Sequence, residues 1–584
     1  MLTQLMSSVA AGLSVYVLYA VFRPQPALQY RMTFLAVVLP LTFLAFPARR
    51  DPDEPRGGVR PGPVEWALAA ASLVVAVYPL VVFDDFIRRT VTPTTTDVVM
   101  GLVALVLILE ATRRTVGPVL PGVALGFLAY AYYGGYLPDW TIAHGGYGPG
   151  RLVAQLYMGS EGIYGVPLDV AATYIVLFAI YGAVLEHSGA SQFFMDLSFA
   201  VFRRSATAPG RTVTVAGFLL GSVSGSGVAT TVSLGSAAWP VLRRAGYPPE
   251  EAGGVLAAAG IGAILSPPTL GAAAFIIAEL LEVSYFEVLV YALVPTLLYY
   301  LGIFVAIEID ARRFGVQPVD VAVPSPWRLL ARFGYHFSSL LLIVGLMALG
   351  QSPFKAVVYA TCLAFVLSFL DPARRLSPRR AMQALAAGVT GVLPVAATTA
   401  AAGIIVGVVT LTGLGLTASS AIVDVAGGNL AVTAILSAIA VMVLGLAVPV
   451  TASFIIAAAI VAPALIGLVA DGGVTEQLSK ITTYMFIFYY AVLSEVSPPT
   501  ALSAVAAASI TGGRAFRTML MTWKYTLPAF LVPLAFMLAP GGRALLGQAP
   551  AGEIVIATVL SAAAVAVLAL ITGRLPRRHR GSGT

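Results

Sequence analysis

Long apolar runs alternate with short polar connectors along most of the chain, and these runs set the expected architecture. Five of them precede an aromatic, Gly-rich segment at 140–150, and they lie near residues 3–22, 33–47, 64–83, 97–112 and 117–136. Later runs lie near residues 169–185, 335–350, 355–370 and 553–573. Most approach the ~20 residues that an α-helix needs to cross a bilayer. The pattern predicts an all-α polytopic membrane protein rather than a barrel of short alternating strands.

The composition supports this class. Of 584 residues, 58% are hydrophobic and 10% are charged, whereas charged residues supply about a quarter of a soluble domain. The net charge of +7 comes from small basic groups at predicted helix ends, such as Arg243-Arg244 and Arg374 to Arg380, and from the tail Arg574 to Arg580. Clustering of this kind predicts cytoplasmic loops and a cytoplasmic C-terminus. It does not indicate nucleic-acid binding, and the four histidines and single cysteine do not suggest a transition-metal site.

A tetrapeptide occurs twice within apolar sequence. Ser266-Pro267-Pro268-Thr269 returns as Ser497-Pro498-Pro499-Thr500. Two adjacent prolines remove two backbone donors and stop a helix. In a membrane such a break is tolerated only where the freed backbone groups face protein, water or an ion. Helices broken at corresponding places in two halves of a chain are typical of a transporter's binding site.

The two copies belong to a longer internal repeat. Gly221 to Gly227 precedes the first copy and Gly445 to Thr451 precedes the second, and a further proline follows each of these segments. The distance from that proline to the Pro-Pro pair is 27 positions in the first case and 35 in the second. The surplus in the second case matches the polar stretch Asp471 to Leu478, which we interpret as a loop insertion. We therefore expect inverted repeats at about 210–310 and 385–540, each with a re-entrant hairpin and a broken helix. The alternative is that apolar, Gly- and Pro-rich segments resemble one another by chance.

Small polar residues at the breaks supply candidate chemistry. Ser222, Ser224 and Ser226 alternate with other small residues, and glycine allows the backbone to unwind. Hydroxyls and free carbonyls suit a dehydrated sodium ion, and half-helix N-termini suit a carboxylate. Further hydroxyl donors near the breaks are Thr230, Thr231, Thr269, Thr451 and Thr500. The competing interpretation of Gly221 to Gly227 is a helix-packing motif of small residues.

One carboxylate breaks the internal symmetry. Glu495 lies three residues before Pro498, where the first repeat has Ile264. An ionisable residue inside a membrane segment is a functional candidate by default. Glu495 could bind a cation or carry a proton; the structural alternative is a hydrogen bond to unwound backbone.

At these residues the chain resembles the permease of tripartite ATP-independent periplasmic (TRAP) transporters. The resemblance lies in the segments 221–229, 244–248 and 266–269, in 445–451 with 462–464, and in 485–500. The last segment resembles the TAXI-type subclass, in which small and large membrane subunits are fused. One departure is Ala447, where the family often has glycine.

The resemblance implies a multi-pass permease of the prokaryotic cytoplasmic (inner) membrane. It implies import of small organic anions, mainly carboxylates, by an elevator-like movement. The coupling ion would be a cation, with sodium favoured over the proton, and no other cofactor is expected. A TAXI-type extracytoplasmic binding protein would deliver the substrate.

The resemblance also places candidate residues at the breaks. The cation-binding candidates are Ser222, Ser224, Gly225, Ser226, Ser266, Thr269, Gly445, Val448, Thr451, Glu495, Ser497 and Thr500. The substrate-binding candidates are Gly227, Thr230, Pro267, Pro268, Pro449, Pro498 and Pro499. We expect residues 1–150 to form a scaffold resembling the small subunit, 151–545 the transport region, and 546–584 a final span with a basic tail.

Three other classes are alternatives to this interpretation. The first is a stand-alone carboxylate or ion antiporter, for which proton coupling is an option. Such an antiporter would share the inverted repeat but would not need the five-segment N-terminal block. A membrane-embedded enzyme would need clustered acid–base or metal-binding residues, and an ATP-driven pump would need a phosphate-binding loop of the Walker type, which the sequence does not contain.

Overall fold

The computed structural model describes residues 2–48, 61–137, 143–202, 208–317, 319, 323–539 and 541–574. Within these ranges every regular element is a helix. Nine of the described helices are long and apolar enough to cross a membrane, or up to 11 if each of two bent helix pairs forms one span. The predicted all-α polytopic class is confirmed. Contacts divide the chain into two compact units, which are described separately below.

The first unit comprises Met1–Ser191, Gly271–Val288 and Gly334–Ala491. Its N-terminal helices are α1 (Leu2–Ala20), α2 (Ala27–Ala45), α3 (Pro63–Val81), α4 (Phe83–Arg88), α5 (Thr95–Val116) and α6 (Val119–Tyr133). Five of these six helices match the five predicted apolar segments. The next helical segments are η1 (Gly134–Tyr136), α7 (Pro149–Val153), η2 (Ala154–Met158), α8 (Val166–Val170), η3 (Ala171–Ile175) and α9 (Val176–Ser188).

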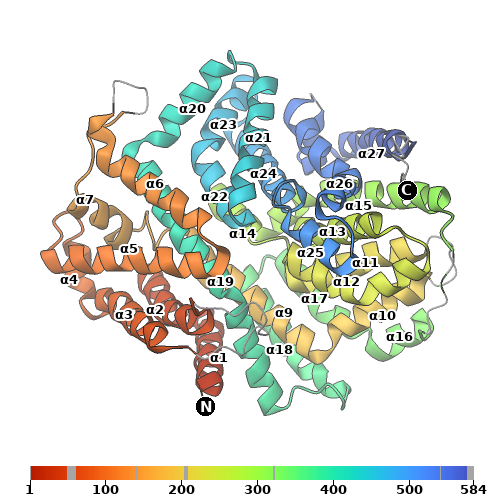
Figure 1. Ribbon diagram of the computed structural model, residues 1–584, viewed down its shortest axis with the longest axis horizontal. Helices are drawn as coiled ribbons and strands as arrows, with labels where there is room; N and C mark the ends of the chain where they lie inside the picture. Colours follow the sequence, from red (N-terminus) through yellow and green to blue (C-terminus); the bar gives the residue numbers. More distant parts are fainter. Residues whose placement is uncertain are drawn as a thin grey trace, which may run out of the picture. The chain divides into compact units, whose positions relative to one another are not determined.

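The later helices of this unit are α14 (Ala273–Leu281), α17 (His336–Ala348), α18 (Pro353–Leu367), η4 (Ser368–Leu370), α19 (Pro378–Thr412), α20 (Leu414–Val425), α21 (Leu430–Ala447), α22 (Val450–Ile460), α23 (Ala462–Asp471) and α24 (Glu476–Leu493). The 35-residue α19 is the central element, since α1, α2, α5, α6, α9 and α22 all pack against it (Figure 1). Small residues allow this close packing: a Cβ at Gly388 would overlap the backbone of Ile180 in α9. Gly413 ends α19 in the left-handed conformation, with φ of 70°.

The second unit comprises Gln192–Leu270, Leu289–Phe333 and Val492–Thr584. Its helices are α10 (Ala190–Phe202), α11 (Ala208–Ser224), α12 (Gly227–Arg244), α13 (Pro249–Leu265), α15 (Tyr285–Phe314), α16 (Pro326–Phe333), η5 (Ser494–Val496), α25 (Leu502–Thr511), α26 (Ala515–Leu538), η6 (Gly542–Leu546) and α27 (Ala551–Arg574). Helix α13 is buried from Glu251 to Leu265 and packs against α11, α12, α25 and α26 (Figure 1). Its composition explains this position, because Ala and Gly let neighbouring backbones approach.

The order of elements repeats along the chain. The first repeat runs α11, α12, α13, Pro-Pro break, α14 and α15. The second runs α21, α22 with α23, α24 with η5, Pro-Pro break, α25 and α26. The matched order of breaks predicted from the sequence is therefore present in the helices.

Three predicted boundaries need correction. The break expected over Gly221 to Gly227 is narrower, because α11 stays helical to Ser224 and only Gly225 and Ser226 are non-helical. Likewise only Val448 and Pro449 separate α21 from α22. The expected loop Asp471 to Leu478 is also shorter, since α24 begins at Glu476. In each case hydrogen bonding within the helix extends the helix into polar or Gly-containing sequence.

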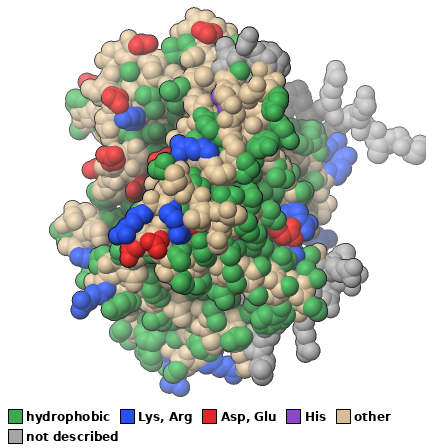
Figure 2. Space-filling model, turned by 90° about the vertical axis from the view of Figure 1, so that its left-hand side faces the viewer, with side chains coloured by type: hydrophobic (Ala, Val, Ile, Leu, Met, Phe, Trp, Pro, Cys, Tyr) green, Lys and Arg blue, Asp and Glu red, His purple; other side chains and the backbone are tan. Residues whose placement is uncertain are grey.

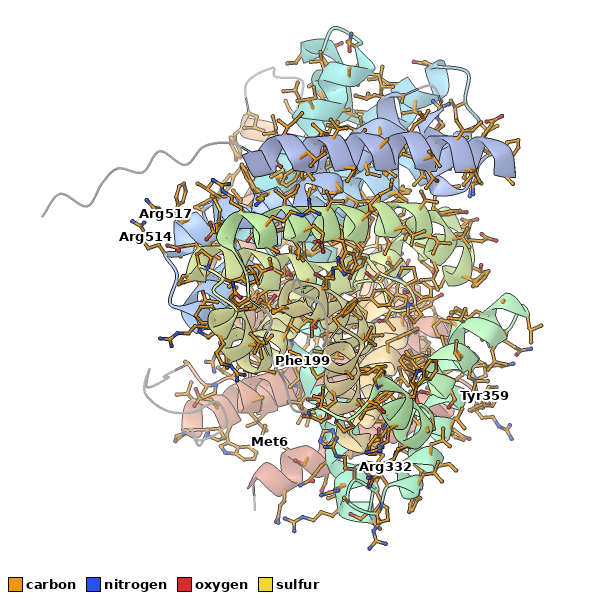
Figure 3. The ribbon with its side chains drawn as sticks, turned by 90° about the vertical axis from the view of Figure 1, so that its right-hand side faces the viewer. Met6, Phe199, Arg332, Tyr359, Arg514 and Arg517 are labelled. Atoms are coloured by element: carbon orange, nitrogen blue, oxygen red, sulfur yellow. The ribbon has the colours of Figure 1, made fainter. Side chains whose placement is uncertain are left out.

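The outer surface is consistent with a lipid environment. Hydrophobic side chains cover wide areas of the face shown in Figure 2, and charged side chains gather in small groups. Helix α27 is the clearest case, because Val555, Ile556, Val559 and Leu560 are each at least 60% exposed. Arg514 and Arg517 project outward at the start of α26 (Figure 3), as expected for basic residues that mark a helix end.

Candidate functional site

The first upstream break is a two-residue link between α11 and α12. Gly225 has φ of 60°, a conformation that favours glycine. Ser226 is extended and caps α12, where its Oγ accepts a hydrogen bond from the Ala229 backbone N–H at 3.4 Å. The N-terminus of an 18-residue helix is therefore presented at this tip. The side chains of Ser222 and Ser224 lie outside the described residues.

The second upstream break has a similar form within the first unit. Val448 is extended, with φ of −138° and ψ of 156°, and Pro449 precedes the first residue of α22. Ser453 Oγ donates to the Val441 carbonyl at 3.3 Å and ties the two sides of this hairpin together. Gly445 and Thr451 flank the link and are partly exposed. This hairpin also presents a helix N-terminus, that of α22.

The two Pro-Pro breaks match each other in backbone geometry. Ser266 has φ of −110° and ψ of 129°, and Ser497 has φ of −99° and ψ of 134°. The Pro267–Pro268 and Pro498–Pro499 peptide bonds are both cis. Both breaks belong to the second unit. The internal repeat is thus expressed in the backbone as well as in the amino-acid letters.

The serine of each break makes the same pair of hydrogen bonds. Ser266 Oγ donates to the Gly262 carbonyl, four residues back, and lies 3.1 Å from the hydroxyl of Tyr300 on α15. Ser497 Oγ donates to the Leu493 carbonyl at 2.7 Å and accepts from Trp523 Nε1 on α26 at 3.1 Å. Each serine therefore closes the preceding helix and is held by an aromatic side chain on the long helix that follows. Sequence reasoning missed Tyr300 and Trp523, because they lie 34 and 26 residues after the serines and belong to no local motif.

Glu495 lies where three helices of the second unit meet. Its Oε2 accepts a hydrogen bond from Ser503 Oγ, in the first turn of α25, at 2.9 Å. The same oxygen lies against Gly227, the first residue of α12, so closely that a Cβ at Gly227 would overlap it. A carboxylate near a helix N-terminus is stabilised by the helix dipole. The structure therefore brings the candidates Gly227 and Glu495 together and adds Ser503, which sequence reasoning missed.

Two threonines connect this junction to α11 and α13. Thr269 Oγ1 donates to the Gly221 carbonyl at 3.4 Å, which links the first Pro-Pro break to the upstream motif. Thr231 is fully buried, and its Oγ1 has no hydrogen-bond partner among the described residues. That hydroxyl packs against Gly260, whose missing Cβ also leaves room for the Gly227 carbonyl. An unsatisfied buried hydroxyl is costly and calls for an explanation.

The remaining candidates fall into separate places. Thr230 is buried in α12, and Thr500 is partly exposed after the second Pro-Pro pair. Gly445, Val448, Pro449 and Thr451 belong to the first unit. No group of three or more His, Cys, Asp or Glu residues that could hold a metal ion occurs in the described ranges. Hydroxyls, carbonyls and one carboxylate are therefore the oxygens available at the junction.

A cavity of about 480 Å³ lies elsewhere, within the first unit. Its lining is largely apolar and comes from the α7–α8 region, α14, α19, α20, α22, α23 and α24, with polar groups that include Glu161, Thr410 and Tyr484. Glu161 is the one charged residue in this lining. A carboxylate in its lining disfavours this cavity as a site for an anion.

Comparison with known proteins gives a consistent result. The family model for the DctM component of the tripartite ATP-independent periplasmic transporter matches residues 103–541. The chain is 29% identical over 110 residues to the 2,3-diketo-L-gulonate TRAP transporter large permease protein YiaN of Escherichia coli, an alignment that covers 19% of this chain and 26% of the relative. It is 27% identical over 96 residues to a putative TRAP transporter large permease protein of Haemophilus influenzae, covering 16% of this chain and 23% of the relative. Each alignment thus spans about a quarter of the relative's length.

Proposed function

The chain belongs to the DctM component family of tripartite ATP-independent periplasmic transporters, and we propose that it is the permease of a cation-coupled importer of small organic anions. The observation that carries the proposal is the junction at Gly227, where a helix N-terminus, the Glu495 carboxylate and the second Pro-Pro break meet. Broken helices of this kind hold ions and substrates in transporters. The paired geometry of Ser266 and Ser497 supports a two-fold arrangement of the transport region.

We propose carboxylates as the substrate class. The N-termini of α12 and α22 lie at the two upstream tips. The first N–H groups of a helix have no acceptor within the helix itself, and such ends attract anions. Gly227, Thr230 and Pro449 lie at or near these ends, so they stay substrate-binding candidates together with Pro267, Pro268, Pro498 and Pro499. One relative is named for 2,3-diketo-L-gulonate, a carboxylate.

The proposed assembly has further parts. An extracytoplasmic binding protein of the TAXI type would deliver the substrate, and residues 1–150 would serve as a fused small subunit. We propose an elevator-like movement between inverted repeats, in a cytoplasmic (inner) membrane with the C-terminus inside. The basis for the orientation is the arginine clustering described above.

Sodium is the coupling ion that we favour. The breaks offer neutral oxygens, including Thr231 Oγ1, Ser226 Oγ and the Gly227 carbonyl, and hard oxygen ligands suit a dehydrated sodium ion. A proton is the second candidate, because Glu495 is the one carboxylate at the junction and is enclosed by Gly227 and Ser503. Proton coupling requires Glu495 to bind and release the proton, whereas sodium coupling requires it at most as one ligand among neutral oxygens.

Reconstituted uptake separates them. Purified permease in liposomes would receive candidate extracytoplasmic binding proteins of the TAXI type and a panel of radiolabelled carboxylates, under separate sodium and pH gradients. With sodium coupling, a sodium gradient alone drives uptake, and Glu495→Gln weakens uptake without abolishing it. With proton coupling, a pH gradient alone drives uptake and Glu495→Gln abolishes it. Uptake that responds to neither gradient, with every substrate tested, would refute the proposed function.

A further inference from the structure

A charged cluster is buried within the second unit, apart from the cation candidates. Asp310 on α15 is fully buried, and Lys524 on α26 forms an ion pair with its Oδ1. The Tyr525 hydroxyl donates a hydrogen bond to the other carboxylate oxygen, Oδ2. Lys524 is itself only 13% exposed. Both oxygens of one buried carboxylate are thus held by consecutive residues of another helix.

A buried ion pair is poor evidence for stability. Desolvation offsets the attraction between the charges, and well-packed apolar residues of similar volume are often as stable. Within a membrane segment such charges are rare and usually functional. The Asp310–Lys524–Tyr525 cluster therefore calls for a role other than stability.

The two helices that it joins are the two that hold the Pro-Pro breaks. On α15, Tyr300 contacts Ser266, and Thr296 Oγ1 donates to the Leu265 carbonyl at 2.6 Å. On α26, Trp523 donates to Ser497. These helices also occupy equivalent positions in the two repeats. The cluster therefore links the supports of the two breaks.

The cluster is closer to the second break along the chain. Lys524 directly follows Trp523, whereas Asp310 and Tyr300 are ten residues apart, about 15 Å along α15. A change in the pairing of Lys524 must therefore be felt at Trp523 and hence at Ser497. The first Pro-Pro break contacts Tyr300, ten residues from Asp310, so a change in the cluster affects the first break less than the second.

We propose that Asp310, Lys524 and Tyr525 are positioning residues that hold Trp523, and through it Ser497, in the geometry that the cation-bound junction requires. The inference rests on the proposed cation coupling and extends it, since the hydrogen bonds and ion pair of these three residues in the described part of the chain join them to one another. It predicts that loss of the cluster lowers cation affinity without loss of the fold.

Trp523 provides a direct probe that needs neither substrate nor binding protein. The other tryptophans, Trp66, Trp140, Trp239 and Trp327, are replaced by Phe in the full-length chain. Trp523 emission is then followed in purified protein during titration with NaCl, with KCl at equal ionic strength as the control. Thermal unfolding of each variant is measured in the same detergent.

The test variant is Asp310→Leu/Lys524→Met/Tyr525→Phe, which removes the charges and the hydroxyl together, so that none of the three partners is left without the others. We expect its half-saturating sodium concentration to rise at least fivefold at an unchanged unfolding temperature. Lys524→Arg, which keeps the charge, should stay within twofold of the parent. Tyr525→Phe alone should raise the half-saturating sodium concentration at least twofold. If the triple variant does not fold, this single variant tests the proposed positioning role.

A neighbouring ion pair supplies the matched control. Arg211 on α11 pairs with Glu308, two residues before Asp310 on the same helix, and both side chains are about one-third exposed. Arg211→Met/Glu308→Leu should leave the sodium response within twofold. An unchanged sodium response in a folded triple variant would overturn the inference, as would a parent protein whose Trp523 emission ignores sodium. Sodium-driven uptake by that same parent would show that the proposed function survives the failure of this inference.

Discussion

Gly227→Ala is the most direct test of the junction at the start of α12. A Cβ at this position would overlap Glu495 Oε2, and it would also lie 3.1 Å from Ile264 Cδ1 and 3.3 Å from Ile261 Cγ2. The closest atom is the end of a flexible side chain, so the carboxylate rather than the backbone must yield. Restoring ordinary van der Waals separation requires a shift of about 1 Å.

The expected cost to the fold is small. Alanine is favoured over glycine in helices by up to about 1 kcal/mol, which offsets the slight crowding against Ile264 and Ile261. The expected cost to cation binding is larger. For a cation about 4 Å from the carboxylate at an effective dielectric constant near 20, an additional 1 Å weakens the attraction by about 0.8 kcal/mol, or about fourfold in affinity. Loss of the Ser503 hydrogen bond to the carboxylate adds to this effect.

The assay is the initial uptake rate as a function of sodium concentration at fixed pH, together with thermal unfolding. We expect Gly227→Ala to raise the half-saturating sodium concentration at least fourfold at a similar unfolding temperature. Gly235→Ala is the matched control, because it lies on the same helix and its Cβ meets only the flexible ends of Ile510 and Leu256. A shorter carboxylate, in Gly227→Ala/Glu495→Asp, should recover part of the loss. Equal sodium responses for the two alanine variants would refute the reasoning.

Three further expectations follow from the structure. Ser226→Ala should lower stability by the cost of a lost helix cap, about 1 kcal/mol, and should also weaken the sodium dependence of uptake. Ser352→Ala, which removes the cap of α18, is the control and should lower the unfolding temperature alone. Thr451→Ala should raise the half-saturating sodium concentration without altering stability, because Thr451 is only partly buried beside the second upstream link; an unaffected uptake curve would exclude it as a ligand. In a Cys362→Ala background, a cysteine at Arg243 should react with a membrane-impermeant reagent only from the cytoplasmic side, and labelling from outside intact cells would contradict the predicted orientation.

Much of the fold was predictable, because membrane helices are encoded by local apolar runs. The five N-terminal segments and the two Pro-Pro breaks appear at the expected positions. The limits of the upstream breaks were less predictable. Ser224 stays in α11 because helical hydrogen bonding continues until a residue such as Gly225, with φ of 60°, ends it.

The junction itself was only partly predictable. Glu495 and Gly227 were both expected to be functional, but 268 positions separate them in the sequence and no local pattern says that they touch. Ser503, Tyr300 and Trp523 carry no motif; their roles arise from packing between helices. The sequence showed which helices break, whereas tertiary structure determines which side chains meet at each break.

The repeat itself shows that Glu495 has a counterpart in space. Ile264 lies three residues before Pro267, as Glu495 lies three residues before Pro498. Both side chains reach the same point, since the Cβ position at Gly227 is within 3.1 Å of Ile264 Cδ1 and overlaps Glu495 Oε2. The two halves therefore offer alternative origins for a carboxylate at the start of α12.

An exchange of these residues tests whether the position of the carboxylate or its helix of origin matters. Glu495→Ile removes the charge and should abolish proton-driven uptake or weaken sodium-driven uptake severalfold. Ile264→Glu/Glu495→Ile returns one carboxylate to Gly227 from α13 and keeps the total side-chain volume, so it should recover a substantial part of the cation response. Ser503 would lose its partner in the exchange, and recovery should therefore remain incomplete. A folded double variant that transports no better than Glu495→Ile would show that the contact with Ser503 and α25, rather than the charge beside Gly227, is what Glu495 supplies.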